Sequence, residues 1–359
     1  MKILHFNEAS ATGTLAISRD LALEQARSGH FVVYWYGERM DTPPDINESF
    51  QGDVLTRKCS LSGFGALATL FRIRREVKLY KYDIVHLHSS KAGFLGRLCL
   101  VGTSAKLIYS PHCISFMRQD VGKIVRRFFI YLERIANLNR STYVACSESE
   151  KVEINKALPT AYVVLIENAI QSLSDESSVS RHNNRKEKLL VVTTGGIRPQ
   201  KGPGMFSQIS SQIGSEGFEF IWVGDGDKAD KIELEKSKVT VTGWVTRKEA
   251  QEVARKCDIF LSTSLWEGLP IALLEAMSIG LCPVVCDCAG NIDVIEDGKT
   301  GFIFSSLEEA ISILNKLRDD RLLLNRVGFA AYKESETRFS IRRFYSEFES
   351  LYAKQALTD

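Results

Sequence analysis

The chain has no long apolar stretch: none of its runs approaches the ~18 apolar residues that a membrane-spanning helix requires. It also shows no cleavable leader pattern, because the opening residues MKILHFNEA predict a strand. A net charge of only +2, without a basic tail, argues against a nucleic acid as the main partner. We therefore expect a cytoplasmic protein that binds no nucleic acid.

The eight cysteines do not form a metal-binding pattern. Cys282, Cys286 and Cys288 cluster, but no second pair or spaced histidines follow, as a structural zinc site would require. The segment CPVVCDC has instead the apolar run of a buried parallel strand, in which cysteine behaves as a small hydrophobe. We expect reduced thiols, no metal and no cofactor.

Apolar strand-like segments alternate with amphipathic helical ones, which predicts βαβ units and parallel sheets. At 359 residues the chain is long enough for two domains. Residues 171–188 break the pattern with serine, asparagine and charge, which is the composition of a linker. The predicted parts are an N-terminal domain over 1–170, this linker, a C-terminal domain over 189–335, and a helix over 336–359 that packs back toward the first domain. Two such sheets facing each other make a cleft.

The expected elements follow from the apolar periodicity. Strands are predicted over 2–6, 30–36, 83–88, 106–110, 142–146, 161–166, 189–195, 218–224, 239–243, 259–263 and 282–286. Helices are predicted over 14–28, 64–80, 91–101, 121–139, 148–157, 201–213, 227–236, 247–256, 269–280 and 307–318.

Ligands of open α/β sheets bind beyond the carboxyl ends of the strands, so the loops after strands are the places to look for chemistry. After LLVVTTG, the loop GIRPQKGPG places Arg198 and Lys201 three residues apart before a helix. Free N–H groups at a helix N-terminus, with two cations beside them, suit a diphosphate. On these residues alone, a solvated turn with ordinary surface cations is the open alternative.

The stretch SLWEGLPIALLEAMSIGLCPVV carries two glutamates eight positions apart in an apolar run. Gly268 and Pro270 predict a turn and the residues after them a helix, so Glu275 falls within the first two turns of that helix. Its carboxylate can accept hydrogen bonds from vicinal hydroxyls, as an acidic residue does for a ribose. Glu267 lies in the preceding loop. The alternative is that Glu275 is an exposed helix residue, although an acid among apolar neighbours needs a partner.

These segments resemble the family 4 glycosyltransferases, which are retaining, nucleotide-sugar-dependent enzymes of the GT-B fold. EGLPIALLE resembles their E-x(7)-E element, and GGIRPQKG resembles their diphosphate-binding loop. Further matches run in order through nearly the whole chain: HLHSSKAGFLGR, YSPHCISF, SESE, ENAI, WVGDGD, GWV and DVIEDGKTGFIF. The resemblance implies an α/β GT-B fold of two Rossmann-like parallel-sheet domains facing a central cleft. It places the acceptor in the first domain and the nucleotide sugar in the second.

The resemblance also implies roles for single residues. Arg198 and Lys201 would neutralise the diphosphate, Glu275 would hold the ribose hydroxyls, and Glu267 would contact the hydroxyls of the donor sugar. The implied donor-binding set is Gly13, Asn168, Arg198, Lys201, Gly268, Leu269, Pro270 and Glu275. Gly13, in EASATGTL, is the one match to a loop that normally carries paired glycines, and Pro270 has no N–H to offer.

His112 and Glu267 are the candidate catalytic residues. The resemblance places His112 near the anomeric carbon in a positioning and electrostatic role, because the departing phosphate accepts the acceptor's proton in retaining enzymes of this type. The family usually has glycine where this chain has Cys113. A buried, hydrogen-bonded histidine is the alternative for His112. For His86 and His88, support of the sheet edge and a place in the site are equally open.

Asp225 and Asp227 in GDGDKA resemble a D-x-D metal motif and a partial dinucleotide fingerprint. Arg198 and Lys201 already supply positive charge, and two carboxylates would face a pyrophosphate unfavourably. We expect neither a metal site nor a dehydrogenase here.

The resemblance thus implies a retaining hexosyl- or related glycosyltransferase that uses a UDP- or GDP-type sugar. Its expected acceptor is a glycan or polyprenyl-diphosphate-linked intermediate of O-antigen, lipopolysaccharide or capsule polysaccharide biosynthesis. The rivals are a nucleotide-sugar epimerase of the same fold and a non-catalytic sugar-nucleotide-binding protein. Basic, apolar stretches over 71–82 and 121–140 favour peripheral attachment to the anionic inner face of the cytoplasmic membrane. The same patterns fit core helices with a solvated face.

Overall fold

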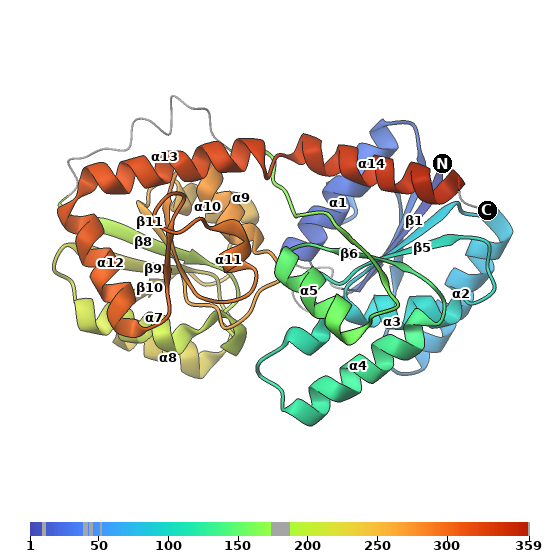
Figure 1. Cartoon of the computed structure of the whole chain (residues 1–359), viewed down its shortest axis with the longest axis horizontal. Helices are drawn as coiled ribbons and strands as arrows, with labels where there is room; N and C mark the ends of the chain where they lie inside the picture. The colour runs from blue at the N-terminus through green and yellow to red at the C-terminus, as the bar shows by residue number, and fades with distance from the viewer. Residues whose placement is uncertain (9–11, 39–41, 43–45, 51, 174–186, 358–359) are drawn as a thin grey trace. The chain divides into compact units, whose positions relative to one another are not determined.

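The structure is a computed structural model, and it describes residues 1–8, 12–38, 42, 46–50, 52–173 and 187–357. The chain divides into two compact units, shown in Figure 1. Unit 1 comprises Met1–Asn168 and Arg342–Asp359, and unit 2 comprises Ala169–Ile341. Each unit is a parallel sheet with helices on both faces.

Unit 1 contains a seven-stranded sheet in the order β3-β2-β1-β4-β5-β6-β7. In Figure 1, α1 and α14 lie on one face of this sheet and α2, α3 and α4 on the other. Its elements are β1 (Lys2–Asn7), α1 (Thr12–Arg27), β2 (Phe31–Gly37), β3 (Leu55–Cys59), α2 (Gly63–Tyr80), β4 (Ile84–His88), α3 (Ser90–Cys99), β5 (Lys106–Ser110), α4 (Lys123–Asn137), β6 (Thr142–Ala145), α5 (Glu148–Ala157), β7 (Tyr162–Leu165) and α14 (Ile341–Leu357).

Unit 2 contains a six-stranded sheet in the order β10-β9-β8-β11-β12-β13. Its elements are β8 (Leu189–Thr194), α7 (Pro203–Ile213), β9 (Phe218–Val223), α8 (Lys228–Lys236), β10 (Val239–Val241), α9 (Arg247–Ala254), β11 (Ile259–Ser262), α10 (Ile271–Ser278), β12 (Cys282–Cys286), α11 (Asn291–Val294), β13 (Phe302–Phe304), α12 (Leu307–Asp319) and α13 (Arg321–Thr337).

The interior strand β1 of unit 1 shows how the two faces of a sheet differ. Side chains alternate along a strand, so Leu4 and Phe6 point to one face and His5 and Asn7 to the other. Leu4 and Phe6 belong to the main apolar core of unit 1 together with Ile73 of α2. His5 and Asn7 are fully buried on the opposite face, where polar groups need hydrogen-bond partners.

The predicted alternation of strands and helices is confirmed, and each of the eleven expected strands exists. Within the described residues, two further strands were not predicted. The edge strand β3, LTRKC, pairs only with β2 and is largely exposed, so its sequence lacks the apolar run of a central strand. The other, β13, is a three-residue strand.

The C-terminal helix α14 begins at Ile341 rather than at the predicted 336, because α13 extends to Thr337. The two helices belong to different units, and Arg342–Asp359 groups with residues 1–168. The first unit ends at Asn168 rather than at the predicted 170, and 174–186 of the predicted linker lie outside the described residues.

Candidate functional site

The order of strands in unit 2 reverses between β8 and β11. The chain runs outward from β8 through β9 to β10 and then returns to the other side of β8. Loops that follow two strands at such a reversal diverge, and the space beyond their carboxyl ends is where open α/β sheets bind ligands. The predicted diphosphate loop follows β8 and the E-x(7)-E element follows β11, so both arise at this point.

Lys201 and Glu267 meet at this reversal. The Lys201 ammonium lies 2.7 Å from the Glu267 carboxylate, and the two side chains are only 15% and 9% exposed. The same carboxylate accepts a hydrogen bond from the Ser264 hydroxyl at 2.8 Å and a longer one from the Gln200 amide at 3.4 Å. We call these four residues the Lys201–Glu267 cluster. It holds one buried cation and one buried anion, each compensating the other.

Backbone contacts fix the loop that carries Lys201. Gly202 has a φ of 63°, and a side chain there would lie 2.0 Å from the carbonyl oxygen of Thr263. The Thr263 hydroxyl donates to the carbonyl oxygens of Lys201 and Gly202, at 2.9 and 3.0 Å. The Leu265 N–H donates to the carbonyl oxygen of Gln200. The glycine is therefore required by the close approach of the two loops.

Other residues of the predicted donor set in unit 2 are close in sequence to Lys201 or Glu267. They differ in how much of each residue is exposed to solvent. Arg198 is exposed, three residues before Lys201. Gly268, Leu269 and Pro270 are buried, and Pro270 precedes the first residue of α10.

Glu275 of α10 has the partners that its apolar surroundings require. Its carboxylate accepts hydrogen bonds from the Arg247 guanidinium at 2.7 Å and from the Gln251 amide at 3.1 Å. Both partners belong to α9, and the Glu275 side chain is 15% exposed. Glu275 also lines a small hollow with Thr194, at the end of β8. The hypothesis of a simple exposed helix residue is wrong.

The two aspartates of the DGD segment have structural partners. Asp227 caps α8 by accepting hydrogen bonds from the N–H groups of Ala229 and Asp230. Asp225 pairs with Lys231 at 3.3 Å. A side chain at Gly226 would lie 2.1 Å from the Ile197 carbonyl oxygen, so this turn packs directly on the loop after β8.

In unit 1, His112 lies in a strained turn after β5. The backbone of His112 has a φ of 54° and that of Cys113 a φ of 88°, a region that favours glycine. The Glu150 carboxylate accepts hydrogen bonds from the N–H groups of Cys113 and Ile114, at 2.9 and 2.8 Å, and from that of Cys146 at 2.8 Å. A buried carboxylate therefore holds the turn in its strained form.

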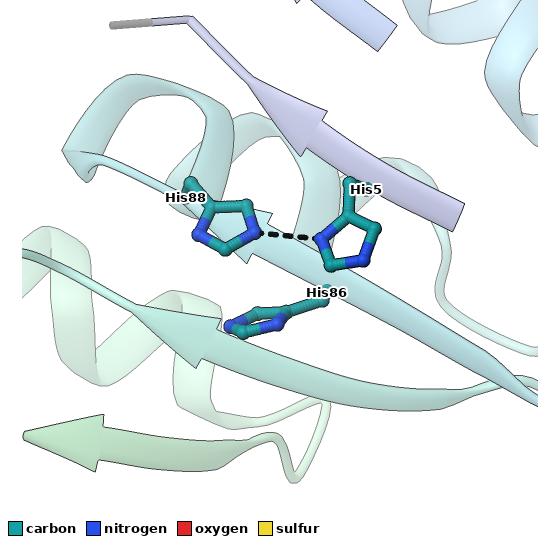
Figure 2. A group of neighbouring side chains, drawn as sticks. All are labelled: His5, His86 and His88. Carbon is teal, nitrogen blue, oxygen red and sulfur yellow. Dashed lines mark hydrogen bonds between the residues drawn. The ribbon is translucent and has the colours of Figure 1, made fainter. Parts of the chain in front are cut away.

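Strand register brings three more histidines to the same place. His86 and His88 are two residues apart on β4 and so share a face, and His5 of β1 lies opposite His86 in the sheet. Figure 2 shows the three rings side by side, with His5 and His88 joined by a hydrogen bond of 2.9 Å between Nδ1 and Nε2. Nδ1 of His88 lies in turn 3.1 Å from Nε2 of His112. These four residues are the histidine cluster.

The pKa of every residue of the histidine cluster is lowered, which favours the neutral imidazole. Burial lowers the pKa of His5 and of His112 to about 4. Burial and the neighbouring imidazoles lower the pKa of His86 and His88 well below the ordinary value. For His86, the partners are the Tyr352 hydroxyl of α14 at 2.5 Å and the Ser110 hydroxyl at 2.8 Å.

The predicted site residues thus fall into both units. Asn168 is buried and lines a small hollow of unit 1 together with His88 and His112. Gly13 lies in the first turn of α1, also in unit 1. Lys201, Glu267 and Glu275 belong to unit 2.

Sequence reasoning missed several partners of these residues. Glu150 follows Ser147 by three positions, which is the spacing of a capping box. This spacing predicts that the Glu150 carboxylate caps the start of its own helix. The Ser147 hydroxyl does accept from the Glu150 N–H, but the carboxylate reaches the turn of His112 instead. No local pattern marked His5, Arg247 or Gln25, because their partners are remote in sequence.

Two family models match the sequence. The model described as Glycosyltransferase Family 4 matches residues 13–172, and the one described as Glycosyl transferases group 1 matches residues 188–320. The chain belongs to the family 4 glycosyltransferases. The matched ranges include His86, His88 and His112 of the histidine cluster. They also include the Arg198–Lys201 loop and the E-x(7)-E element.

The curated relatives include two bacterial proteins that cover most of the chain. A UDP-Gal:alpha-D-GlcNAc-diphosphoundecaprenol alpha-1,3-galactosyltransferase of Escherichia coli is 28% identical over 316 residues, which cover 80% of this chain and 79% of the relative. An uncharacterized 41.2 kDa protein in the cps region of Klebsiella pneumoniae is 28% identical over 265 residues, covering 70% and 74%. The chain is a glycosyltransferase, and the E. coli relative is named for a diphosphoundecaprenol-linked substrate.

Solved structures share the fold. Anabaena HepE in complex with UDP and glucose superposes with a TM-score of 0.83 at 16% identity, covering 99% of this chain and 100% of that chain. The sucrose-phosphate synthase of Thermosynechococcus elongatus gives a TM-score of 0.84 at 15% identity, with coverage of 99% and 98%. The fold is therefore GT-B, as the sequence predicted. Within the described residues, no helix combines the length and apolar character needed to cross a bilayer.

Proposed function

We propose that this glycosyltransferase is a retaining enzyme that transfers a hexosyl or related sugar from a nucleotide-diphosphate sugar to a lipid-linked glycan. The observation that carries the proposal is the buried Lys201–Glu267 pair at the reversal of strand order, with the exposed Arg198 three residues away. A diphosphate bound beside Lys201 and Arg198 would pair its negative charge with these two cations of unit 2.

Glu267 has two tasks in this proposal. Without a ligand its carboxylate compensates the Lys201 ammonium, and the Ser264 hydroxyl helps to hold it in place. With a donor bound, the phosphates compensate Lys201, and the carboxylate is available to accept hydrogen bonds from sugar hydroxyls. Negative charge near the sugar then stabilises the anomeric carbon as it becomes cationic.

The transfer itself balances without any further reagent. The bond between C1 of the donor sugar and the diphosphate oxygen breaks, and a bond from C1 to the acceptor oxygen forms on the same face. The departing phosphate takes the acceptor's proton. Lys201 and Arg198 stabilise the negative charge on the leaving group, and the neutral His112 orients hydroxyls near C1 by hydrogen bonding.

The lipid-linked acceptor is supported by the E. coli relative, whose name specifies a diphosphoundecaprenol substrate. We include peripheral attachment to an anionic membrane in the proposal, because α2 and α4 expose apolar residues beside cations. Ile124, Phe128 and Tyr131 of α4 are 83%, 54% and 60% exposed, and Leu67 and Phe71 of α2 are 68% and 69% exposed. Exposed cations on the same helices are Lys123, Arg127, Arg72, Arg75 and Lys78. Apolar insertion together with cations is how amphipathic helices hold an anionic surface.

Two arginines of the predicted membrane faces form hydrogen bonds to backbone carbonyl oxygens of unit 1 instead. Arg134 donates to the carbonyl oxygen of Ala157, and Arg74 donates to that of Val101. The proposed face therefore consists of the exposed residues named above.

A two-step experiment tests the proposed function. Thermal unfolding with a panel of UDP- and GDP-sugars identifies the donor, because a ligand at 100 times its Kd stabilises the folded state by about 2.7 kcal/mol. Incubation of that donor with a polyprenyl-diphosphate-linked N-acetylglucosamine should then give a disaccharide lipid whose anomeric configuration equals that of the donor. An inverted product would contradict the retaining mechanism. Binding of donors without transfer to any lipid-linked or free glycan would favour the non-catalytic alternative, and epimerised donor would favour the epimerase.

A further inference from the structure

The histidine cluster contains a continuous chain of hydrogen bonds that ends at His112. Oε1 of Gln25, on α1, lies 2.7 Å from Nε2 of His5. Nδ1 of His5 lies 2.9 Å from Nε2 of His88, and Nδ1 of His88 lies 3.1 Å from Nε2 of His112. Three imidazoles are thus linked in the order His5, His88, His112. His5 and His88 each use one ring nitrogen toward one neighbour and the second nitrogen toward the other.

Such a chain has a direction. A neutral imidazole carries one N–H and one unprotonated nitrogen, so the hydrogen bond at one nitrogen decides the role of the other. The Gln25 carbonyl oxygen can only accept, so His5 donates to it from Nε2 and must accept at Nδ1. His88 then donates from Nε2 and accepts at Nδ1, and His112 donates from Nε2.

We infer that Gln25, His5 and His88 are positioning residues that fix the ring and tautomer of His112, so that its Nδ1 is presented to the ligand as a hydrogen-bond acceptor. The inference rests on the proposed function, since it assigns to His112 a hydroxyl of the donor or acceptor sugar as its partner. A hydroxyl that donates to Nδ1 is oriented by it, whereas the other tautomer would offer an N–H and repel the same hydroxyl hydrogen.

The surroundings of His112 support this assignment. The ring is half-buried and lines a hollow of unit 1, while no hydrogen bond to its Nδ1 occurs among the described residues. Its turn has positive φ angles at His112 and Cys113 and is held by the Glu150 carboxylate, which accepts a hydrogen bond from the N–H group of Cys113. Strain maintained by the surrounding structure is typical of functional positions.

A metal site is the competing interpretation of the same cluster. Ligand atoms of His5, His86 and His88 all lie within 4.8 Å of one another, which is close enough for one ion. However, both nitrogens of each of the three rings already have hydrogen-bond partners, namely Gln25, His88, His112, Tyr352, Ser110 and His5. A metal ion could bind only if some of these hydrogen bonds broke. The hydrogen-bond chain requires no such rearrangement and is therefore the simpler interpretation of the cluster.

The tautomer can be measured directly on the full chain labelled with 15N-histidine. Two-bond 15N–1H correlations distinguish Nε2–H from Nδ1–H, and His112→Gln assigns the His112 signals. We expect a single Nε2–H tautomer for His112 in the wild type. His88→Phe and Gln25→Met, which remove acceptors from the chain, should produce Nδ1–H or a mixture.

Two matched variants test that the chain rather than general packing is responsible. Gln25→Glu keeps an acceptor at the same place and should retain the Nε2–H tautomer, while Gln25→Met is of similar size and should not. Ser110→Ala removes a hydrogen bond of His86, which lies beside the chain but outside it, and should leave the tautomer of His112 unchanged.

The kinetic readout uses the donor and acceptor identified for the wild type. His88→Phe and Gln25→Met should lower kcat by up to about 100-fold, because a small misplacement of a positioning group is enough to cause such a loss, and Gln25→Glu should restore most of it. Affinity for the free nucleotide diphosphate should not change, because Arg198, Lys201 and Glu275, which are proposed to bind its diphosphate and ribose, belong to unit 2.

The outcomes are distinct. Mixed tautomers in the wild type, a single Nδ1–H tautomer, or an unchanged tautomer in His88→Phe and Gln25→Met would overturn the inference. One equivalent of tightly bound zinc in the protein purified without chelator would overturn it in favour of a metal site. Absence of sugar transfer with every donor would refute the proposed function, while the tautomers would still decide whether the chain positions His112.

Discussion

The Lys201–Glu267 pair allows a quantitative prediction by a double-mutant cycle with Lys201→Met and Glu267→Gln. At 2.7 Å and an effective dielectric constant of 20, the attraction of the two charges is about 6 kcal/mol before desolvation. Because both side chains are at least 85% covered, much of that attraction offsets the desolvation of the two ions. The net coupling should then be about 2 to 3 kcal/mol in the free energy of unfolding.

The two single substitutions should have unequal costs. Lys201→Met leaves Glu267 with hydrogen bonds from Ser264 and Gln200, so we expect a loss of about 2 kcal/mol. Glu267→Gln leaves the buried ammonium of Lys201 without a compensating charge, so we expect a loss of about 3 kcal/mol, at the low end for a broken buried pair. The double variant should be close to Lys201→Met.

Urea unfolding followed by circular dichroism measures these differences, and the chain offers a matched control. Lys299 and Glu296 lie at nearly the same distance, 2.8 Å, but their side chains are 66% and 64% exposed. Their coupling should be barely measurable, because solvent screens an exposed pair. Equal coupling energies for the two pairs would refute the reasoning from burial.

The same variants report on the ligand. Lys201→Met should weaken the nucleotide diphosphate far more than the bare nucleoside, because the diphosphate carries the charge that Lys201 is proposed to meet. Glu267→Gln should leave nucleotide diphosphate affinity nearly unchanged and reduce transfer. Calorimetry with nucleoside, nucleotide diphosphate and donor separates the two roles, and identical binding profiles for both variants would show that the assignment is mistaken.

Four further predictions follow from the proposed site and the exposed helices. Glu275→Ala should weaken donor and nucleotide diphosphate alike by about 1.5 to 3 kcal/mol in calorimetry, whereas Arg247→Ala should not; loss of donor affinity alone would exclude a ribose contact. Ile124→Ser with Phe128→Ser should reduce flotation with anionic vesicles and Leu322→Ser, at an exposed site of unit 2, should not; a wild type that stays in solution at low salt would refute membrane attachment. Sugar transfer should survive excess chelator, and loss of activity that Mg²⁺ restores would contradict this. Burial lowers the pKa of His5 and His112 to about 4 and the pKa of His86 and His88 well below the ordinary value. Unfolding therefore takes up protons below about pH 6.5, and the free energy of unfolding should fall as the pH decreases from there to about pH 4, by up to about 1.4 kcal/mol per pH unit for each histidine. Urea melts that do not change between pH 7 and pH 5 would contradict this prediction.

Sequence alone was sufficient for the alternation of strands and helices, eleven of the strands, the two-sheet fold and the family. Apolar runs and helical periodicity are local properties, so β5 was predicted over 106–110, the range that the structure assigns to it. Turn residues marked the loops after β8 and β11, where Lys201 and Glu267 meet. The edge strand β3 lacked that local signal because it is mostly exposed.

Only the tertiary structure decided which side chains act together. His5 and His88 are separated by 83 positions in the chain and meet because β1 and β4 are neighbours in register. Glu150 has a capping-box position, but the fold directs its carboxylate to the turn after β5. Register, sheet order and the approach of distant loops depend on the whole chain packing at once, and no spacing along the sequence encodes them.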